Sequence, residues 1–300
     1  MTCRLTILFT FLMLGTLTLA AQTLIPVQSG VIPREEPYFQ RASGIGIDAG
    51  GQVYVVDSGL NQVSKFDREG RPAAHIGGFG SGEGQFDTPV DLFALKTLDI
   101  YVADYFNNRV VRLDKNLNFL NALSSDQVES PYRFERVLSV AVSPQYDLFL
   151  LEEGQKQVIK FDRSTDPSTV FGGMLDPYGQ LLEPRALALE SNKRVFVSDP
   201  GQPAVVVFDY FGNFLTTLSH PALEEPASLY WGEDQRLYVG EPSGTLWIFN
   251  PQLKLETRLQ LPLAEEPLSD IAVSYQLADK SRTLYALSPT RCRIFQLKTP

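Results

Sequence analysis

The sequence predicts an all-β fold made of six repeated units, each with four short antiparallel strands. A segment recurs along the chain that reads as a strand, an acidic turn, a second strand and Phe-Asp or its equivalent. No stretch shows the long periodicity of an amphipathic helix. Four-stranded units that repeat every 40 to 50 residues or so are typical of a β-propeller. The six copies begin at Tyr54, Tyr101, Phe149, Phe196, Tyr238 and Tyr285, with spacings of 47, 48, 47, 42 and 47 residues.

Each copy is preceded by a short apolar stretch, which we expect to be the inner strand of its blade. These stretches are GIGID at 44–48, DLFAL at 91–95, SVAVS at 139–143, ALALE at 186–190, SLYWG at 228–232 and DIAVS at 270–274. A further strand-like piece follows each of the first five copies, as in RPAAHIG at 71–77. Blades packed face to face around an axis bury both faces of each sheet, which a lone four-stranded sheet cannot do. The expected blades span about 41–77, 87–124, 134–172, 183–219, 225–261 and 267–300.

The two ends of the chain are expected to close the ring together. The sixth unit ends at Pro300 before a convincing fourth strand, and an open ring would leave an exposed strand edge. The segment TLIPVQSG at 23–30 alternates as a strand does and lies outside the repeats. We expect it to pair onto the last blade as its outer strand, so that residues 22–300 form one domain.

Residues 1–21 read as a secretory signal peptide. Arg4 precedes an apolar run from Leu5 to Ala20, and small residues end that run. An uncleaved membrane anchor is the alternative, but the run is shorter than the roughly 20 residues that a bilayer requires. We expect cleavage, no transmembrane segment afterwards, and an exported, monomeric protein in the periplasm or outside the cell.

The net charge argues against one class of partner, and the cysteine count argues against an internal disulfide. Without residues 1–21 the chain keeps 25 of its 26 basic residues and all 35 acidic ones, a net charge of −10. An acidic surface repels phosphate backbones, so we expect no nucleic-acid partner. Cys3 would leave with the signal peptide, which leaves Cys292 without a partner for a disulfide. Cys292 lies between Arg291 and Arg293, whose charges would favour the thiolate.

The glycine-rich stretch IGGFGSGEGQFDTP at 76–89 is predicted to connect two blades. It has the same length and place as FGGMLDPYGQLLEP at 171–184, and neither stretch shows the lysine or the following helix of a phosphate-binding loop. Glycine allows turns at positive φ, and proline starts a strand without losing a ladder hydrogen bond.

The connector and the strands after it resemble the NHL-repeat family of six-bladed propellers. The matching residues are GEGQF at 82–86 with Pro89, YVAD at 101–104 and NNRV at 107–110. The resemblance implies the propeller fold, and it leaves the activity open because such propellers include protein-binding, RNA-binding, sensor and lyase members. The two histidines, His75 and His220, end outer strands, which speaks against a zinc site built from several histidines.

Two sets of acidic residues recur. Asp57, Asp104, Glu152, Asp199 and Glu241 occupy one equivalent turn position, where we expect them to cap backbone N–H groups. A second set lies where the chain enters the inner strands and could converge on the central channel as a site for Ca²⁺, which takes six to eight oxygen ligands. Such a site would support the alternative function of a metal-dependent hydrolase or lyase of the lactonase-like propeller type. Its candidate ligands are Asp91, Glu183, Glu225, Glu266 and Asp270.

Arginine and aromatic residues cluster in the lead-ins to the inner strands. EEPYFQR at 35–41 and ESPYRFER at 129–136 are related, and residues of these types often carry binding energy at interfaces. The alternative is that they pair with neighbouring acids and fix the connectors. The candidate binding residues are Tyr38, Arg41, Asp91, Tyr132, Phe134, Arg136 and Arg185.

We therefore expect a binding or scaffold module with no catalytic residues and no cofactor. Its ligand face would be the connector face, which carries the blade-to-blade connectors and the turns at 57–61, 104–108, 152–156, 199–203, 241–244 and 288–291. The expected partner is a protein or peptide, with a carbohydrate as a further alternative.

Overall fold

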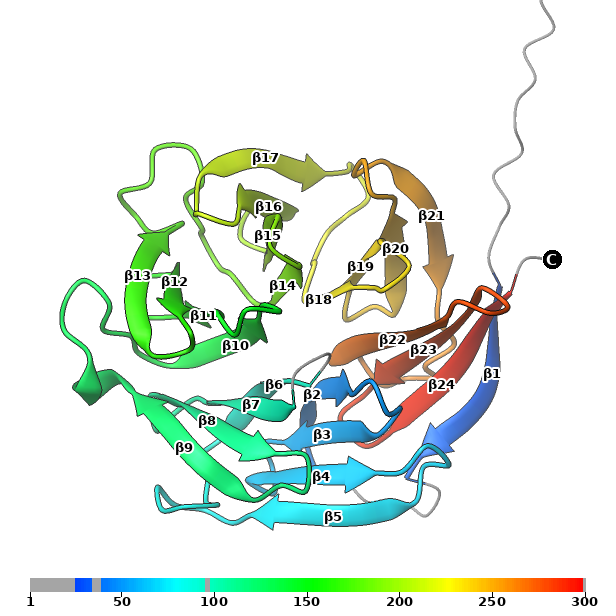
Figure 1. The fold of residues 1–300 in the computed structure, drawn as a ribbon. Helices are drawn as coiled ribbons and strands as arrows, with labels where there is room; N and C mark the ends of the chain where they lie inside the picture. The colour runs from blue at the N-terminus through cyan, green and yellow to red at the C-terminus, as the bar shows by residue number, and fades with distance from the viewer. Residues whose placement is uncertain (1–24, 34–38, 95–97, 299–300) are drawn as a thin grey trace, which may run out of the picture.

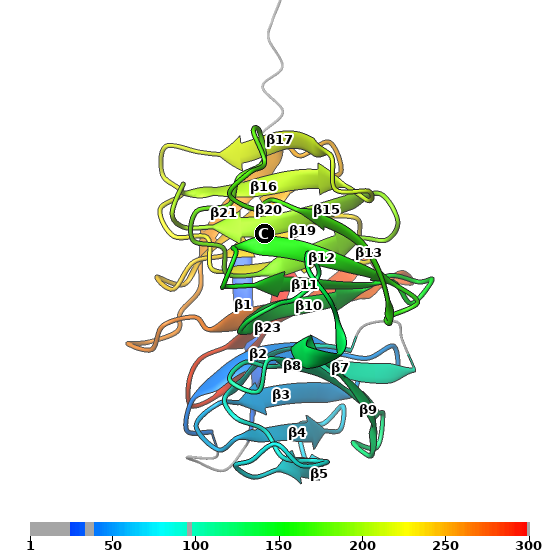
Figure 2. The same cartoon turned by 90° about the vertical axis from the view of Figure 1, so that its left-hand side faces the viewer.

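The computed structural model describes residues 25–33, 39–94 and 98–298, and it is a six-bladed β-propeller (Figure 1). Six sheets of four antiparallel strands surround a central axis, with the outer strands at the circumference. Figure 2 turns the ring onto its side, where β9 and β13 form part of the outer edge. The fold class predicted from the repeats is confirmed.

The first five blades each contain four consecutive strands, which follow one another from the axis outward. Blade 1 contains β2 (Ala42–Ile47), β3 (Val53–Asp57), β4 (Gln62–Phe66) and β5 (Pro72–Gly77). Blade 2 contains β6 (Pro89–Phe93), β7 (Asp99–Asp104), β8 (Arg109–Asp114) and β9 (Phe119–Ser124). Blade 3 contains β10 (Val137–Val142), β11 (Leu148–Glu152), β12 (Gln157–Asp162) and β13 (Asp166–Phe171). Blade 4 contains β14 (Leu187–Glu190), β15 (Arg194–Asp199), β16 (Ala204–Asp209) and β17 (Phe214–Ser219). Blade 5 contains β18 (Ser228–Trp231), β19 (Leu237–Gly240), β20 (Thr245–Phe249) and β21 (Leu255–Gln260). A single turn of 3₁₀ helix, η1 (Ser125–Gln127), follows blade 2.

The sixth blade combines both ends of the chain, as predicted. Its strands are β22 (Asp270–Gln276), β23 (Ser281–Leu287), β24 (Cys292–Lys298) and, on the outside, β1 (Ile25–Ile32). Strand β1 runs antiparallel to β24 from Ile25 opposite Lys298 to Ile32 opposite Cys292. Ile32 is buried, and its side chain packs in the core between blade 6 and blade 1. The closing strand therefore joins two blades and completes the ring.

The hydrophobic core is divided among the blade interfaces. Within the described residues there are six clusters of buried apolar side chains, and each draws mainly on two neighbouring blades. The second strand of a blade contributes on both faces, as Tyr54 and Val55 of β3 do in two different clusters. Because each blade needs a neighbour on both sides, the ring is stable only when it is closed.

Buried carboxylates tie each connector to the turn of the blade that it enters. Asp199 accepts hydrogen bonds from the backbone N–H groups of Leu182 and Glu183, both at 2.7 Å, and from Gly201 at 3.1 Å. Glu241 accepts from the N–H groups of Glu224 and Glu225 in the same way. We call the five acids at this position the carboxylate clips, and all five are buried. The prediction that they cap backbone N–H groups is confirmed. They are Asp57, Asp104, Glu152, Asp199 and Glu241.

The connector at 78–88 is a loop whose backbone hydrogen bonds fold it back on itself, as between Phe86 N–H and the Gly78 carbonyl. No helix in the described part of the chain is long and apolar enough to cross a membrane.

Candidate functional site

Three polar side chains of the inner strands, Asp91, Ser139 and Asp270, face the central channel among mainly apolar residues, and we call these three the polar ring. In three blades a β-bulge interrupts the inner strand, between Ala42 and Gly44, between Pro89 and Asp91, and between Val137 and Ser139. A bulge changes the direction of the side chains that follow it. At this level the channel is a narrow cavity of about 70 Å³, whose lining includes Asp91, Ser139 and Asp270.

Side chains of the polar ring hydrogen-bond the backbone of the next blade. The Asp91 carboxylate accepts from the Val140 N–H at 3.0 Å and from the Ser139 hydroxyl at 2.6 Å. The Ser139 hydroxyl in turn accepts from the Leu187 N–H at 3.1 Å, and the Asp270 carboxylate accepts from the Ile45 N–H at 2.9 Å. Neighbouring inner strands belong to different sheets, so these contacts join them where no ladder does.

Asp91 and Asp270 interact electrostatically across this ring. Burial raises the pKa of Asp91 to about 6. Hydrogen bonds from Ser139, Val140 and Leu92 favour the charged form and oppose this rise, but burial has the larger effect. Burial and, next, the charge of Asp91 raise the pKa of Asp270 well above its ordinary value. Two carboxylates that share a buried site cannot both ionise freely, so the pair retains a proton towards neutral pH.

We predict that Asp270→Asn stabilises the protein at high pH. Both carboxyl groups have a higher pKa in the folded than in the unfolded state, so the stability from their protonation is present at low pH and is lost as the pH rises through the folded-state values. The asparagine oxygen can still accept from Ile45 N–H while the charge is gone. We expect the free energy of unfolding to increase by roughly 1–3 kcal/mol at pH 8 and to change little near pH 4. Urea unfolding at both pH values measures this, and an equal gain at both would contradict the assignment.

The five acids considered as metal ligands do not come together. Within the described residues, no three His, Cys, Asp or Glu side chains lie close enough to hold one metal ion. Glu266 is an ion-pair partner of Arg293, at 3.3 Å, and accepts a hydrogen bond from Thr290. Glu183 and Glu225 line a separate hollow of about 370 Å³ on the connector face, between blades 4 and 5. Of the five acids, Asp91 and Asp270 alone line the channel cavity.

The arginines proposed for the connector face are exposed there. The Arg136 guanidinium lies 3.1 Å from Glu153, and the charges of Arg136 and Arg185 both act on the Tyr105 hydroxyl. Burial, followed by a hydrogen bond to Glu153, raises the pKa of Tyr105. Arg41 donates from Nε to the Ser58 hydroxyl at 2.8 Å in blade 1. The sequence interpretation missed Tyr105 and Glu153, although both lie in or beside the turns that it assigned to this face.

The aromatic residues proposed with these arginines lie elsewhere. Phe134 is buried in the core between blades 2 and 3, where its ring meets that of Phe161 edge-on, with the centroids 6.3 Å apart. The expectation that Phe134 lines a surface site is therefore wrong. Tyr132 is half-buried against the same core, and its hydroxyl donates to the Ser168 carbonyl of the outer strand β13 at 3.4 Å. Tyr38 lies outside the described residues.

The connector face exposes a different set of large apolar side chains, which sequence periodicity could not identify. They belong to the loops at 78–88, 105–108 and 172–186, and each of those loops is held by a carboxylate clip. Between blades 2 and 3 the same face carries a polar hollow of about 580 Å³ bordered by Asn107, Arg133 and Gln155. The exposed apolar residues are Phe79, Phe106, Met174, Leu175, Tyr178 and Leu182.

The histidines and the cysteine lie away from the channel. His75 is exposed on β5, and His220 is exposed after β17, where its ring packs 4.9 Å from that of Trp247. Cys292 is fully buried in β24, and burial raises the pKa of its thiol far above its usual range. The expectation that the adjacent arginines favour a thiolate is wrong, because desolvation outweighs the charge of Arg293.

Comparisons with known proteins support the fold. No family model matches the sequence, and no curated protein matches it. Among solved structures, the chain is similar to a catalytically inactive histidine-to-alanine variant of virginiamycin B lyase from Staphylococcus aureus with quinupristin, at 11% identity and a TM-score of 0.60 over 92% of this chain and 99% of that one. It is also similar to a streptogramin B lyase, at 12% identity and a TM-score of 0.59 over 92% of this chain and 97% of that one. The WD40 β-propeller domain of Doa1 aligns at 9% identity and a TM-score of 0.59, over 91% of this chain and 97% of that domain.

Proposed function

We propose that the protein is a binding or scaffold propeller that recognises a protein or peptide through its connector face. The observation that carries this proposal is the set of exposed apolar side chains on loops that buried carboxylates hold in place. Exposed apolar groups on a rigid support are typical of interaction surfaces, because little conformational freedom is lost on binding.

The arginines add a preference for acidic groups in the partner. Arg136 and Arg185 lie near Tyr105, and the Arg136 side chain is 45% exposed. Arg and Tyr side chains are frequent hot spots of interfaces. A peptide with apolar side chains beside an acidic residue fits this surface.

A lyase function has less support in this chain. The lyase similar in fold is described as inactive when a histidine is replaced by alanine. The two histidines of this chain are exposed at the circumference of the ring, and the channel at its polar ring holds only about 70 Å³. We further propose that the chain acts as an NHL-like propeller, as a monomer and outside the cytoplasm; the repeat motifs and the signal-like residues 1–21 support these points.

The test is affinity capture from the exported fraction of the native cell, with the protein lacking residues 1–21 as bait. The connector-face variant carries Arg41→Glu and Arg136→Glu, and the matched control carries Arg163→Glu and Lys254→Glu in exposed turns of the opposite face. With unchanged melting midpoints, we expect the parent and the control to retain the same partner and the connector-face variant to bind it at least about tenfold more weakly. Equal retention by all three baits would refute the connector face as the site.

A further inference from the structure

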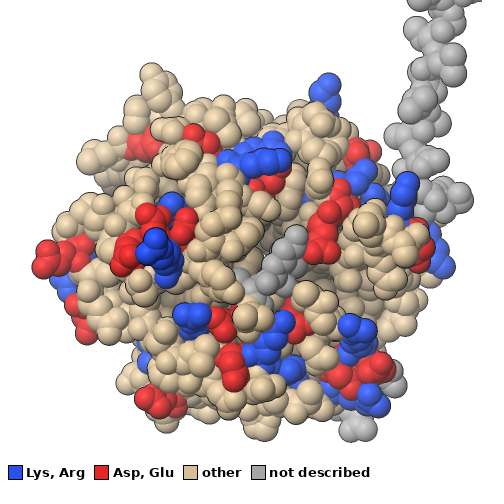
Figure 3. All heavy atoms as spheres, in the orientation of Figure 1, with Lys and Arg blue, Asp and Glu red and all other residues tan. Residues whose placement is uncertain are grey.

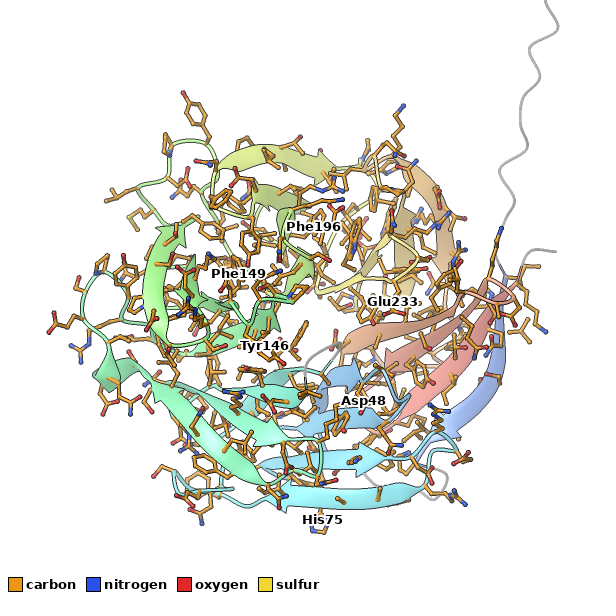
Figure 4. All side chains as sticks on the ribbon, in the orientation of Figure 1. Asp48, His75, Tyr146, Phe149, Phe196 and Glu233 are labelled. Carbon is orange, nitrogen blue, oxygen red and sulfur yellow. The ribbon has the colours of Figure 1, made fainter. Side chains whose placement is uncertain are left out.

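The opposite face of the ring carries a hollow at the mouth of the central channel. This hollow of about 300 Å³ lies between blades 3, 4 and 5 and is bordered by the turns that join their first and second strands. Pockets that bind small molecules begin at about this size and combine aromatic walls with a few polar groups. Figure 3 shows this face, and in Figure 4 Tyr146 and Glu233 lie near its centre. None of the connector-face residues borders the hollow, so it is separate from the proposed peptide site.

Trp231 forms a fixed aromatic wall of the hollow. Its indole stacks on Phe196 with the ring centroids 5.4 Å apart and the planes 9° from parallel. The Arg194 guanidinium lies 5.5 Å from the centre of the Trp231 ring. It donates hydrogen bonds to Glu190 and, at 2.9 Å, to the Pro251 carbonyl. The indole is therefore positioned before any ligand arrives.

Tyr146 stands at a turn position that favours glycine. Its N–H donates to the carbonyl three residues earlier, as does the N–H of Gly51 in the equivalent turn of blade 1. Gly51 has φ of 76° and Tyr146 has φ of 66°, so a bulky aromatic residue adopts a conformation that is uncommon for it. Gln235 has the same place in blade 5, with φ of 61°. Both side chains border the hollow.

Three polar side chains around the hollow are available to form hydrogen bonds with a ligand. The side chains of Tyr146, Ser191 and Gln235 border it from three different blades and form no hydrogen bond within the described part of the chain. Ser143 differs, since its hydroxyl already accepts from the N–H groups of Gln145 and Asp147. An aromatic wall with hydroxyl and amide groups and the Glu233 carboxylate at its edge suits a ligand that has an apolar face and hydrogen-bond donors around its rim.

We propose that this hollow binds a carbohydrate, with one sugar ring packed against Trp231. A sugar ring presents C–H groups on its faces and hydroxyl groups around its edge, which matches the wall and the three polar side chains. The site goes beyond the protein or peptide binding proposed for the connector face and does not depend on it.

The two tryptophans allow a direct test. Trp247 is fully buried, and its Nε1–H donates to Glu241, so it serves as an internal reference. The probes are the methyl glycosides of glucose, galactose and N-acetylglucosamine, with tetramethylammonium chloride as the cationic comparison. In ¹H–¹⁵N spectra, with the indole signals assigned through Trp231→Phe, we expect at least one glycoside at millimolar concentration to shift the Trp231 signal and leave Trp247 unchanged. No shift with any glycoside, or a shift with tetramethylammonium alone, would overturn the proposal.

Tyr146→Gly separates binding from folding. Glycine adopts the positive φ at this turn without strain, so the melting midpoint should stay the same or rise. Loss of the aromatic contact and the hydroxyl should weaken the glycoside at least about tenfold. Lys280→Gly is the matched control, because Lys280 is exposed with φ of 57° in the β22–β23 turn, away from the hollow. Unchanged affinity in Tyr146→Gly, or equal loss in the control, would refute the site.

Discussion

Removal of residues 22–33 should reduce the free energy of unfolding by about 5 kcal/mol or more, which is a large part of the stability of an ordinary domain. The deletion removes β1, so β24 becomes an unpaired edge and the buried Ile32 leaves the core between blades 6 and 1. An exposed β-edge also promotes association between chains. Thermal unfolding and size-exclusion chromatography measure the two effects, and we expect a large decrease in the melting midpoint together with oligomers.

A peptide with the sequence of residues 23–33 provides the control for this deletion. Added in excess, it should pair with β24 and restore part of the lost melting midpoint, because ligand binding to the folded state stabilises it. A scrambled peptide of the same composition should have no effect. A monomeric deletion variant with the midpoint of the parent would show that β1 does not close the ring.

Asp199→Ala should reduce the free energy of unfolding by about 3–5 kcal/mol, because four partly buried donors lose a charged acceptor at once. The Asp199 carboxylate is fully buried and accepts from three backbone N–H groups and from the Gln202 amide, the latter at 2.7 Å. Each hydrogen bond to a charged group contributes about 1.5–3 kcal/mol. Urea unfolding measures the difference.

The matched control for this clip is Asp209→Ala in the same blade. Asp209 also accepts from two backbone N–H groups, of Phe211 and Asn213, but these lie in an exposed turn where water can replace the carboxylate. We expect a loss of about 1 kcal/mol or less for this variant. Similar losses in the two variants would mean that the clip at Asp199 has no special role in holding the connector.

The fold could be predicted from the sequence because its signals are local and repeated. The spacing of the six copies gives the blade number, and the lone strand-like segment near the N-terminus has no other place to pair than the last blade. The clip acids were also predictable, since an acid next to a tight turn has N–H groups within reach. These inferences do not require knowing how deeply a residue is buried.

The candidate site was predicted less well, because it depends on how deeply each side chain is buried and on where it points. The bulge before Asp91 directs that carboxylate to the channel, whereas Glu183 stands three residues earlier in its own inner-strand lead-in and lines a hollow of the connector face. A sequence shows both as acids near the start of an inner strand. Phe134 was misplaced for a related reason. Its N–H donates a hydrogen bond to the Ser125 hydroxyl, and its aromatic ring is buried in the core.

The two proposed sites, on opposite faces of the ring, would make the propeller a two-sided adaptor. The exposed apolar residues of the connector face and the hollow at the channel mouth have no residue in common. Two occupants on opposite faces would therefore never compete for space, and the protein could hold both at once. Any influence of one on the affinity of the other would have to pass through the blades themselves as a coupling free energy, equal in both directions.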